Sequence, residues 1–159
     1  MRKPEELDSV EALIIPGGES TTIGKLATRF NLIEPLRQRI EDGMPTWGTC
    51  AGMILLASDV TGAEQPLLRA LDIVVERNAF GRQNESFEAD LEIAGLDTPF
   101  PAVFIRAPWV VKTGPGVEVL AEVERHPVMV EQGTILATAF HPELTGDLRL
   151  HRRFVDLIE

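Results

Sequence analysis

The sequence contains a single cysteine, Cys50, in the segment GTCAG at residues 48–52. Residues 44–47 indicate a short strand before it, and the apolar residues 53–57 indicate the start of a helix after it. The flanking glycines permit a sharp strand-to-helix turn that strains and exposes the central side chain, as in a nucleophile elbow. The N–H groups and dipole at the helix N-terminus favour a thiolate. Cys50 is therefore a candidate nucleophile, and the alternative is a buried cysteine that acts as a small apolar residue.

His141 is a candidate general base for this nucleophile. It follows residues 135–140, which predict a strand, and Pro142 favours an extended conformation for it. In an extended chain, side chains two residues apart point to the same side, so Glu143 can orient the imidazole. A cysteine, a histidine and an acid in these roles perform nucleophilic acyl transfer. The alternative for an isolated His-x-Glu pair is a solvated or structural histidine.

The other two histidines suit solvated positions. His126 precedes Pro127 in an expected turn, and His151 lies beside two arginines on the expected final helix. One cysteine and three scattered histidines do not show metal-ligand spacing, so we expect no metal site.

Composition limits the function classes. A chain of 159 residues with 44% hydrophobic residues suits one domain over residues 1–159. The net charge of −10 argues against a nucleic-acid partner, which would need a basic surface. One cysteine excludes an internal disulfide, and we find neither a signal-peptide pattern nor an apolar run long enough to span a membrane. These features predict a soluble cytoplasmic α/β protein.

The N-terminal half predicts two strands and three helices. Residues 12–15 form a short apolar run typical of a parallel strand that is covered on both faces. The segment PGGESTT at residues 16–22 follows, where N–H groups can point at a ligand. Ser20 or Thr21 can cap the next helix, over residues 22–30. Another helix is expected over residues 33–42, ending at a glycine.

The C-terminal half predicts mainly strands. Residues 59–69 and 77–86 suit loops, and Gln132 with Gly133 suits a hairpin turn. The core face of a final helix over residues 147–158 would hold Leu150, Phe154, Leu157 and Ile158. The expected strands cover residues 71–77, 87–93, 102–106, 117–123, 128–131 and 135–140.

Three segments carry a family resemblance: PGGESTT at residues 16–22, GTCAG at 48–52 and FHPE at 140–143. Together they resemble the class I, or triad, glutamine amidotransferases. Two more segments, ERNAFGRQ at residues 76–83 and FIRAP at 104–108, make the chain similar to the glutaminase subunits of pyridoxal 5′-phosphate synthases. The resemblance extends over essentially the whole chain.

The resemblance implies a flavodoxin-like α/β fold. Its sheet would be mostly parallel and flanked by helices, with additional antiparallel strands in the C-terminal half. The implied activity is hydrolysis of glutamine to glutamate and ammonia, with no cofactor. The ammonia would pass to a barrel-fold synthase subunit, which builds pyridoxal 5′-phosphate from pentose and triose phosphates.

Residue roles also follow from the resemblance. Cys50 would be the nucleophile, and His141 and Glu143 would complete the triad. An arginine suits the α-carboxylate of glutamine. The alternative for Arg77 and Arg106 is that each forms an ordinary surface ion pair. The backbone N–H groups of Gly17, Gly18 and Ala51 would form an oxyanion hole. Glutamine would be held by Gly18, Glu19, Ser20, Arg77, Ile105 and Arg106.

Two alternatives stay open at this point. One is the glutaminase of another pathway, such as imidazole-glycerol-phosphate synthase, against which residues 77–83 argue. The other is a catalytically impaired binding protein. Members of the family begin with a further strand and helix, so we expect this chain to lack one βα unit of about thirty residues. The chain alone would then be aggregation-prone and weakly active.

Overall fold

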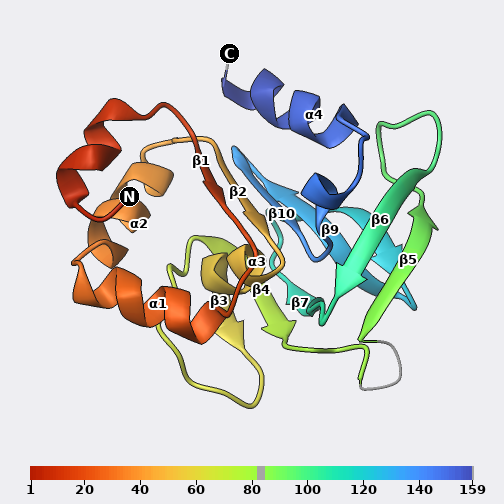
Figure 1. Ribbon diagram of the computed structural model, residues 1–159, viewed down its shortest axis with the longest axis horizontal. Coiled ribbons are helices and arrows are strands. Elements are labelled where there is room, and N and C mark those ends of the chain that lie inside the picture. The colour runs from red at the N-terminus through yellow and green to blue at the C-terminus, as the bar shows by residue number, and fades with distance from the viewer. Residues whose placement is uncertain (82–84, 159) are drawn as a thin grey trace.

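The computed structural model describes residues 1–81 and 85–158, an α/β arrangement of helices around three sheets (Figure 1). Arg82 and Gln83, which belong to the segment at residues 76–83, lie outside the described residues. The elements are η1 (Pro4–Ser9), β1 (Leu13–Ile15), α1 (Ser20–Arg29), α2 (Ile33–Glu41), β2 (Thr46–Thr49), α3 (Ala51–Leu56), β3 (Ala57–Val60), β4 (Leu71–Glu76), β5 (Ser86–Leu91), β6 (Phe100–Ile105), β7 (Trp109–Thr113), β8 (Glu118–Val123), β9 (His126–Gln132), β10 (Ile135–Thr138), η3 (Pro142–Leu144) and α4 (Arg149–Ile158).

The largest sheet has the order β1-β2-β10-β9-β8. β2 pairs in parallel with β1 on one side and with β10 on the other, so that Gly48 lies opposite both Ile15 and Ala137. All residues of β2 and β10 are buried. Because the three parallel strands end at one edge of the sheet, the residues that follow β1 and β2 meet there.

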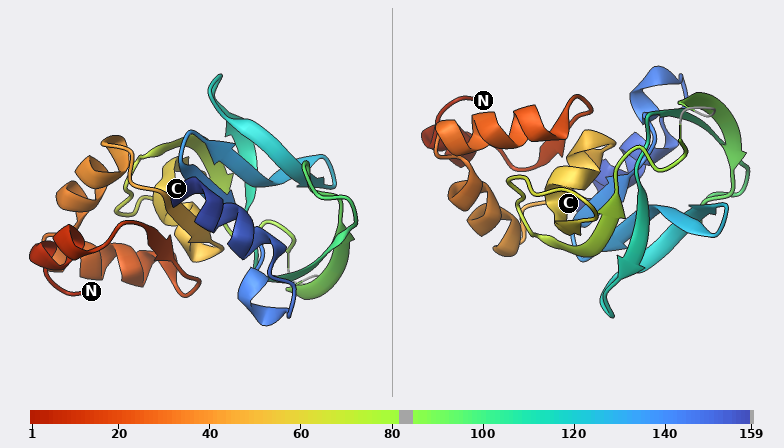
Figure 2. Two further views of the ribbon diagram at one scale, coloured as in Figure 1. Left: turned by 90° about the horizontal axis from the view of Figure 1, so that it is seen from above. Right: turned by 90° about the horizontal axis from the view of Figure 1, so that it is seen from below.

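Helices cover both faces of this sheet. On one face α3 packs directly on Gly48, where a Cβ atom would lie 2.7 Å from the side chain of Leu56. On the other face Trp47 packs on α4, with its ring centroid 5.6 Å from that of Phe154. Helices α1, α2 and η1 lie at one end of the molecule, and the β5-β6 hairpin lies at the opposite end (Figure 2). The expected class, with helices flanking parallel strands and antiparallel strands in the C-terminal half, is confirmed.

Antiparallel pairing dominates after β4. β9 pairs with β10 and with β8, β4 pairs with β7, and β5 pairs with β6. The predicted hairpin between β9 and β10 is confirmed, but its turn lies one residue later, at Gly133 and Thr134, because Gln132 still pairs with Ile135. Two strands were not predicted: β3 overlaps the expected loop at residues 59–69, and β7 carries exposed Val111 and Lys112 that break the strand pattern. Both depend on tertiary pairing with β4.

The expectation that residues 12–15 are covered on both faces is wrong. In the described chain β1 forms the edge of its sheet, and the side chain of Ile14 is 47% exposed. An apolar run of this length does not by itself show which of its faces is covered. No helix of the described residues has both the length and the apolar character required to cross a membrane.

His126 and His151 are partly buried and pack on tryptophan rings, so the expectation that both are solvated is wrong, although His151 lies on the final helix as predicted. His151 packs edge-on against Trp47 with ring centroids 5.0 Å apart, and its Nδ1 is buried without a partner in the described chain. His126 begins β9, so the predicted turn is wrong, and its ring stacks on Trp109 at 3.7 Å. On α4, Leu150 and Phe154 are buried as predicted and Leu157 is partly buried, whereas Ile158 is 37% exposed. Ile158 is therefore not a core residue.

The contact between Trp47 and Phe154 predicts the stability of two α4 variants. Because Phe154 is 4% exposed, Phe154→Ala should lower the free energy of unfolding by about 3–5 kcal/mol. Val155 on the same helix is 51% exposed, so Val155→Ala should change it by less than about 0.5 kcal/mol. Urea unfolding of both variants measures the difference, and equal effects would contradict this packing.

Candidate active site

Cys50 occupies the turn between β2 and α3 in a strained conformation, with φ of 50° and ψ of −104°. Few residues with a side chain adopt positive φ, and the surrounding structure must enforce it. The backbone N–H of Cys50 donates to the carbonyl oxygen of Thr138 at 2.7 Å, which fixes the turn to β10. The predicted elbow conformation is confirmed.

Gly48 and Gly52 let the turn at Cys50 pack closely against β1 and β2. A Cβ atom on Gly52 would lie 2.0 Å from the carbonyl oxygen of Ile15, and one on Gly48 would lie 2.5 Å from the backbone of Gly52. No side chain fits at such distances, so the sequence Gly-x-Cys-x-Gly is required for this close approach of β1, β2 and α3. The end of β1 and the residues after it are thereby held beside Cys50.

The thiol of Cys50 is not exposed. The residue is 7% exposed, and its Sγ lies 3.7 Å from the carbonyl oxygen of Ile105, to which the thiol donates. Burial raises the pKa of Cys50 to about 11; the N–H of Ala51 opposes this shift, and the charge of Glu143 adds to it. The expectations of an exposed sulfur and a favoured thiolate are therefore wrong for this structure, because desolvation outweighs the helix N-terminus.

His141 is oriented by Glu143. The Nδ1–H of His141 donates to the Glu143 carboxylate at 2.8 Å, which leaves Nε2 available on the other side of the ring. The backbone N–H of His141 donates to the carbonyl oxygen of Val103 at 2.8 Å, and the ring lies against Gly17, where a Cβ atom would be 2.6 Å from Cε1. Glu143 lies in the 3-10 helix η3, so the reasoning from an extended chain is wrong although the predicted pair forms.

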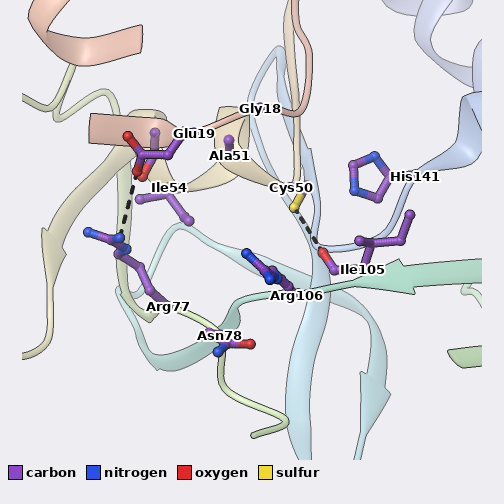
Figure 3. Close-up of a pocket in the computed structure, with 11 residues that line it drawn as sticks. Gly18, Glu19, Cys50, Ala51, Ile54, Arg77, Asn78, Ile105, Arg106 and His141 are labelled. Carbon is purple, nitrogen blue, oxygen red and sulfur yellow. Dashed lines mark hydrogen bonds and ion pairs between the residues drawn. The ribbon is translucent and has the colours of Figure 1, made fainter. Parts of the chain in front are cut away.

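Cys50 and His141 line one cavity of about 490 Å³ (Figure 3). Every residue predicted to bind glutamine lines it too. Of the remaining predicted site residues, Ala51 also lines the cavity, whereas Gly17 and Glu143 contact His141. The lining consists of Gly18, Glu19, Ser20, Cys50, Ala51, Ile54, Arg77, Asn78, Ile105, Arg106 and His141.

Ile54 and Asn78 were not predicted as site residues. Ile54 lies on α3, four positions after the N-cap residue Cys50, and its backbone N–H donates to the carbonyl oxygen of Cys50 at 3.3 Å. Asn78 lies next to Arg77 within the segment at residues 76–83 that carried the resemblance. Its position in this segment could have predicted it as a site residue. Its φ of 45° shows that the chain turns sharply there.

Glu19, not Ser20 or Thr21, is the N-cap of α1. Its carboxylate accepts from the N–H groups of Thr21 and Thr22, at 3.1 and 2.8 Å, and from the Thr22 hydroxyl at 2.8 Å. These hydrogen bonds, chiefly those from Thr22, lower the pKa of Glu19 to about 2. The Ser20 hydroxyl is buried and donates to Gln65. The predicted cap is therefore wrong, because the carboxylate of Glu19 accepts from the N–H groups two and three residues after it.

The two arginines differ in their contacts. Arg77 donates to Thr21 and to Gln65, at 3.3 and 3.2 Å, and lies 3.7 Å from the Glu19 carboxylate. The Arg106 side chain points into the cavity in Figure 3, and in the described chain no carboxylate forms an ion pair with it. Arg106 is thus available to an anionic ligand.

Known proteins are similar to this chain in sequence and in fold. Residues 1–159 match the SNO glutamine amidotransferase family. The chain belongs to this family. A protein of Pelotomaculum thermopropionicum named pyridoxal 5′-phosphate synthase subunit PdxT is 62% identical over 157 residues, which are 98% of this chain and 80% of that protein. The protein of the same name from Frankia casuarinae is 61% identical over 99% of this chain and 81% of its own length.

Solved structures show the same fold. A crystal structure of a glutamine amidotransferase has a TM-score of 0.94 and 56% identity, and the match covers 99% of this chain and 84% of that one. The crystal structure of a putative GMP synthase subunit from Thermoplasma acidophilum has a TM-score of 0.65 at 16% identity, covering 98% and 76% of the two chains, and shares the fold alone. Among the described residues, no group of three or more His, Cys, Asp or Glu side chains is arranged to hold a metal ion.

The raised pKa of Cys50 predicts slow alkylation of the folded chain. With a pKa of about 11 instead of 9.0, the thiolate fraction at pH 8 should fall about a hundredfold. The rate constant for iodoacetamide should keep rising up to about pH 11. Because Cys50 is the only cysteine, the same chain unfolded in urea is the matched control. A rate that levels off below pH 9 in the folded chain would contradict a buried neutral thiol.

Proposed function

We propose that this chain hydrolyses L-glutamine to L-glutamate and ammonia and delivers the ammonia to a pyridoxal 5′-phosphate synthase subunit. The observation that carries the proposal is the strained Cys50 beside a cavity that it shares with His141, whose Nδ1 is held by Glu143 at 2.8 Å. The family match and the relatives named pyridoxal 5′-phosphate synthase subunits support the choice of substrate and partner.

In the first step of catalysis, Nε2 of His141 would take the proton of the Cys50 thiol while the sulfur bonds to the substrate. The sulfur attacks the side-chain amide carbon of glutamine and forms a tetrahedral intermediate. His141 then gives its proton to the leaving nitrogen, so that ammonia departs and a γ-glutamyl thioester remains. Water, activated by the same histidine, attacks the thioester and releases glutamate and the thiol. Since the free thiol has a high pKa, the proton moves during the attack rather than beforehand.

The backbone around Cys50 suits the stabilisation of the intermediate. The N–H groups of Gly17, Gly18 and Ala51 are our candidates for the oxyanion hole. Gly17 lies against the His141 ring, and Gly18 and Ala51 line the cavity that His141 also lines. Such donors are effective because they are positioned before the charge develops.

Substrate binding would use the charged and polar groups of the cavity wall. Arg106, without an acidic partner in the described chain, suits the α-carboxylate of glutamine. The α-ammonium needs an acceptor, and the Glu19 carboxylate and the Ile105 carbonyl group both lie at the cavity. Gly18, Ser20 and Arg77 complete the wall around the substrate.

The proposed partner is a synthase subunit with a barrel fold, and the proposed compartment is the cytoplasm. The reaction requires a free thiol, and cytosolic conditions keep thiols reduced. The chemistry assigned to these residues requires no cofactor.

Substitutions of the three triad residues test the mechanism. Cys50→Ser should reduce glutamine hydrolysis by at least about 10⁴-fold, because the hydroxyl is a much weaker nucleophile here. His141→Asn should reduce it by about 10³-fold. Glu143→Gln should have the smallest effect, because this residue orients the base and does not transfer the proton. Ammonia release with the synthase subunit measures all three.

Circular dichroism confirms that each variant is folded. Comparable ammonia release from a folded Cys50→Ser variant would contradict the proposed function. A larger loss in Glu143→Gln than in His141→Asn would show that the roles of base and orienting acid are assigned wrongly.

The open position of Arg106 predicts a substrate-binding defect. Arg106→Gln removes the charge and keeps most of the stem, so KM for glutamine should rise about tenfold or more while kcat changes less. Arg152, an exposed arginine on α4 outside the cavity, provides the control Arg152→Ala. Equal KM values in the two variants would exclude the carboxylate-binding role.

A further inference from the structure

Gln65 joins two walls of the cavity although it lies in a loop without regular secondary structure, between β3 and β4. Its Oε1 accepts from the hydroxyl of Ser20 at 3.3 Å and from Nη1 of Arg77 at 3.2 Å. Ser20 is the first residue of α1, and Arg77 follows β4. Three segments far apart in the sequence therefore meet at one oxygen atom.

The chemistry of Arg77 fixes the orientation of the Gln65 amide. A guanidinium group only donates hydrogen bonds, so the amide oxygen, not the nitrogen, must face it. The Nε2 of Gln65 then points away from Arg77, and it is buried without a partner in the described chain. A buried unsatisfied donor is unfavourable, and an apolar side chain of similar size would avoid it. The useful atom of this side chain is thus its acceptor.

The loop around Gln65 is anchored well enough to position that acceptor. Arg37 on α2 donates to the carbonyl oxygen of Leu68 at 2.6 Å, and the N–H of Leu68 donates to Leu55 on α3 at 2.7 Å. The backbone of Pro66 packs on α1 at Gly24, where a Cβ atom would lie 2.8 Å from the Pro66 oxygen. Gln65 is therefore fixed relative to both α1 and α3.

We propose that Gln65 is a positioning residue of the glutamine site, whose amide oxygen holds Arg77 and Ser20 in place. The proposal rests on the proposed function. Gln65 is not among the residues that line the cavity, so it acts through these two neighbours. Without the acceptor, the contacts left to the Arg77 guanidinium among residues 1–81 and 85–158 are the Thr21 hydroxyl and a long contact with Glu19. Glutamine should then bind more weakly, while the steps at Cys50 proceed at a similar rate.

Two variants of Gln65 and one of its neighbour separate this role from a structural one. Gln65→Met keeps the size and removes the acceptor, and it should raise KM for glutamine about tenfold, as expected for loss of a hydrogen bond to a charged group, with kcat changed less than about threefold. Gln65→Glu keeps an oxygen that faces Arg77 and should keep KM within about threefold of the unaltered chain. Glu64→Met, at an exposed neighbouring position, should leave both constants unchanged.

The assay measures ammonia release with the synthase subunit, and crystal structures of Gln65→Met and Gln65→Glu show the Arg77 side chain. An unchanged KM in Gln65→Met, or equal rises in KM in Gln65→Met and Gln65→Glu, would overturn the proposal. If the unaltered chain does not hydrolyse glutamine, the proposed function is wrong. The crystal structures then decide the role of Gln65: displacement of Arg77 in Gln65→Met alone supports it, and an unmoved Arg77 overturns it.

Discussion

The close approach of β1, β2 and α3 is the constraint on which the rest of the site depends. Gly52 lies against the carbonyl oxygen of Ile15, and Gly48 lies against Gly52, with no room for a side chain at either glycine. This contact forces Cys50 into positive φ and brings the residues after β1 beside it. Because β10 pairs with the other side of β2, the same sheet edge also receives the segment that carries His141 and Glu143. The strand order therefore brings together the proposed nucleophile, the proposed base and the candidate backbone donors.

The same tight packing determines the state of the thiol. Burial keeps Cys50 protonated, with its hydrogen directed to the carbonyl oxygen of Ile105. A neutral buried thiol is protected from oxidation and alkylation, and in the proposed mechanism it loses its proton to His141 only when glutamine is bound. The cavity wall is organised for that entry by hydrogen bonds that involve Glu19 and Arg77. The structure thus combines a buried neutral thiol with a cavity wall that is held in place by hydrogen bonds.

Sequence patterns predicted the parts of this account that depend on local spacing. The flanking glycines predicted the elbow at Cys50, and the spacing of His141 and Glu143 predicted their pairing, although η3 replaces the expected extended chain. The burial of the thiol, the cap formed by Glu19 and the contacts of Gln65 were not predictable, because each depends on residues distant in the sequence or on side-chain reach. For the same reason β7 was missed: its pairing with β4 defines it, and its own pattern does not.

The central claim is that the sulfur of Cys50 forms a covalent bond with the substrate. Mixing the chain and the synthase subunit with glutamine, quenching in acid within milliseconds and analysing the peptides by mass spectrometry tests it most directly. We predict a mass increase of one glutamyl group on the peptide that contains Cys50, absent from Cys50→Ser. Glutamate production without any glutamyl adduct on this peptide, at times shorter than one turnover, would contradict the claim.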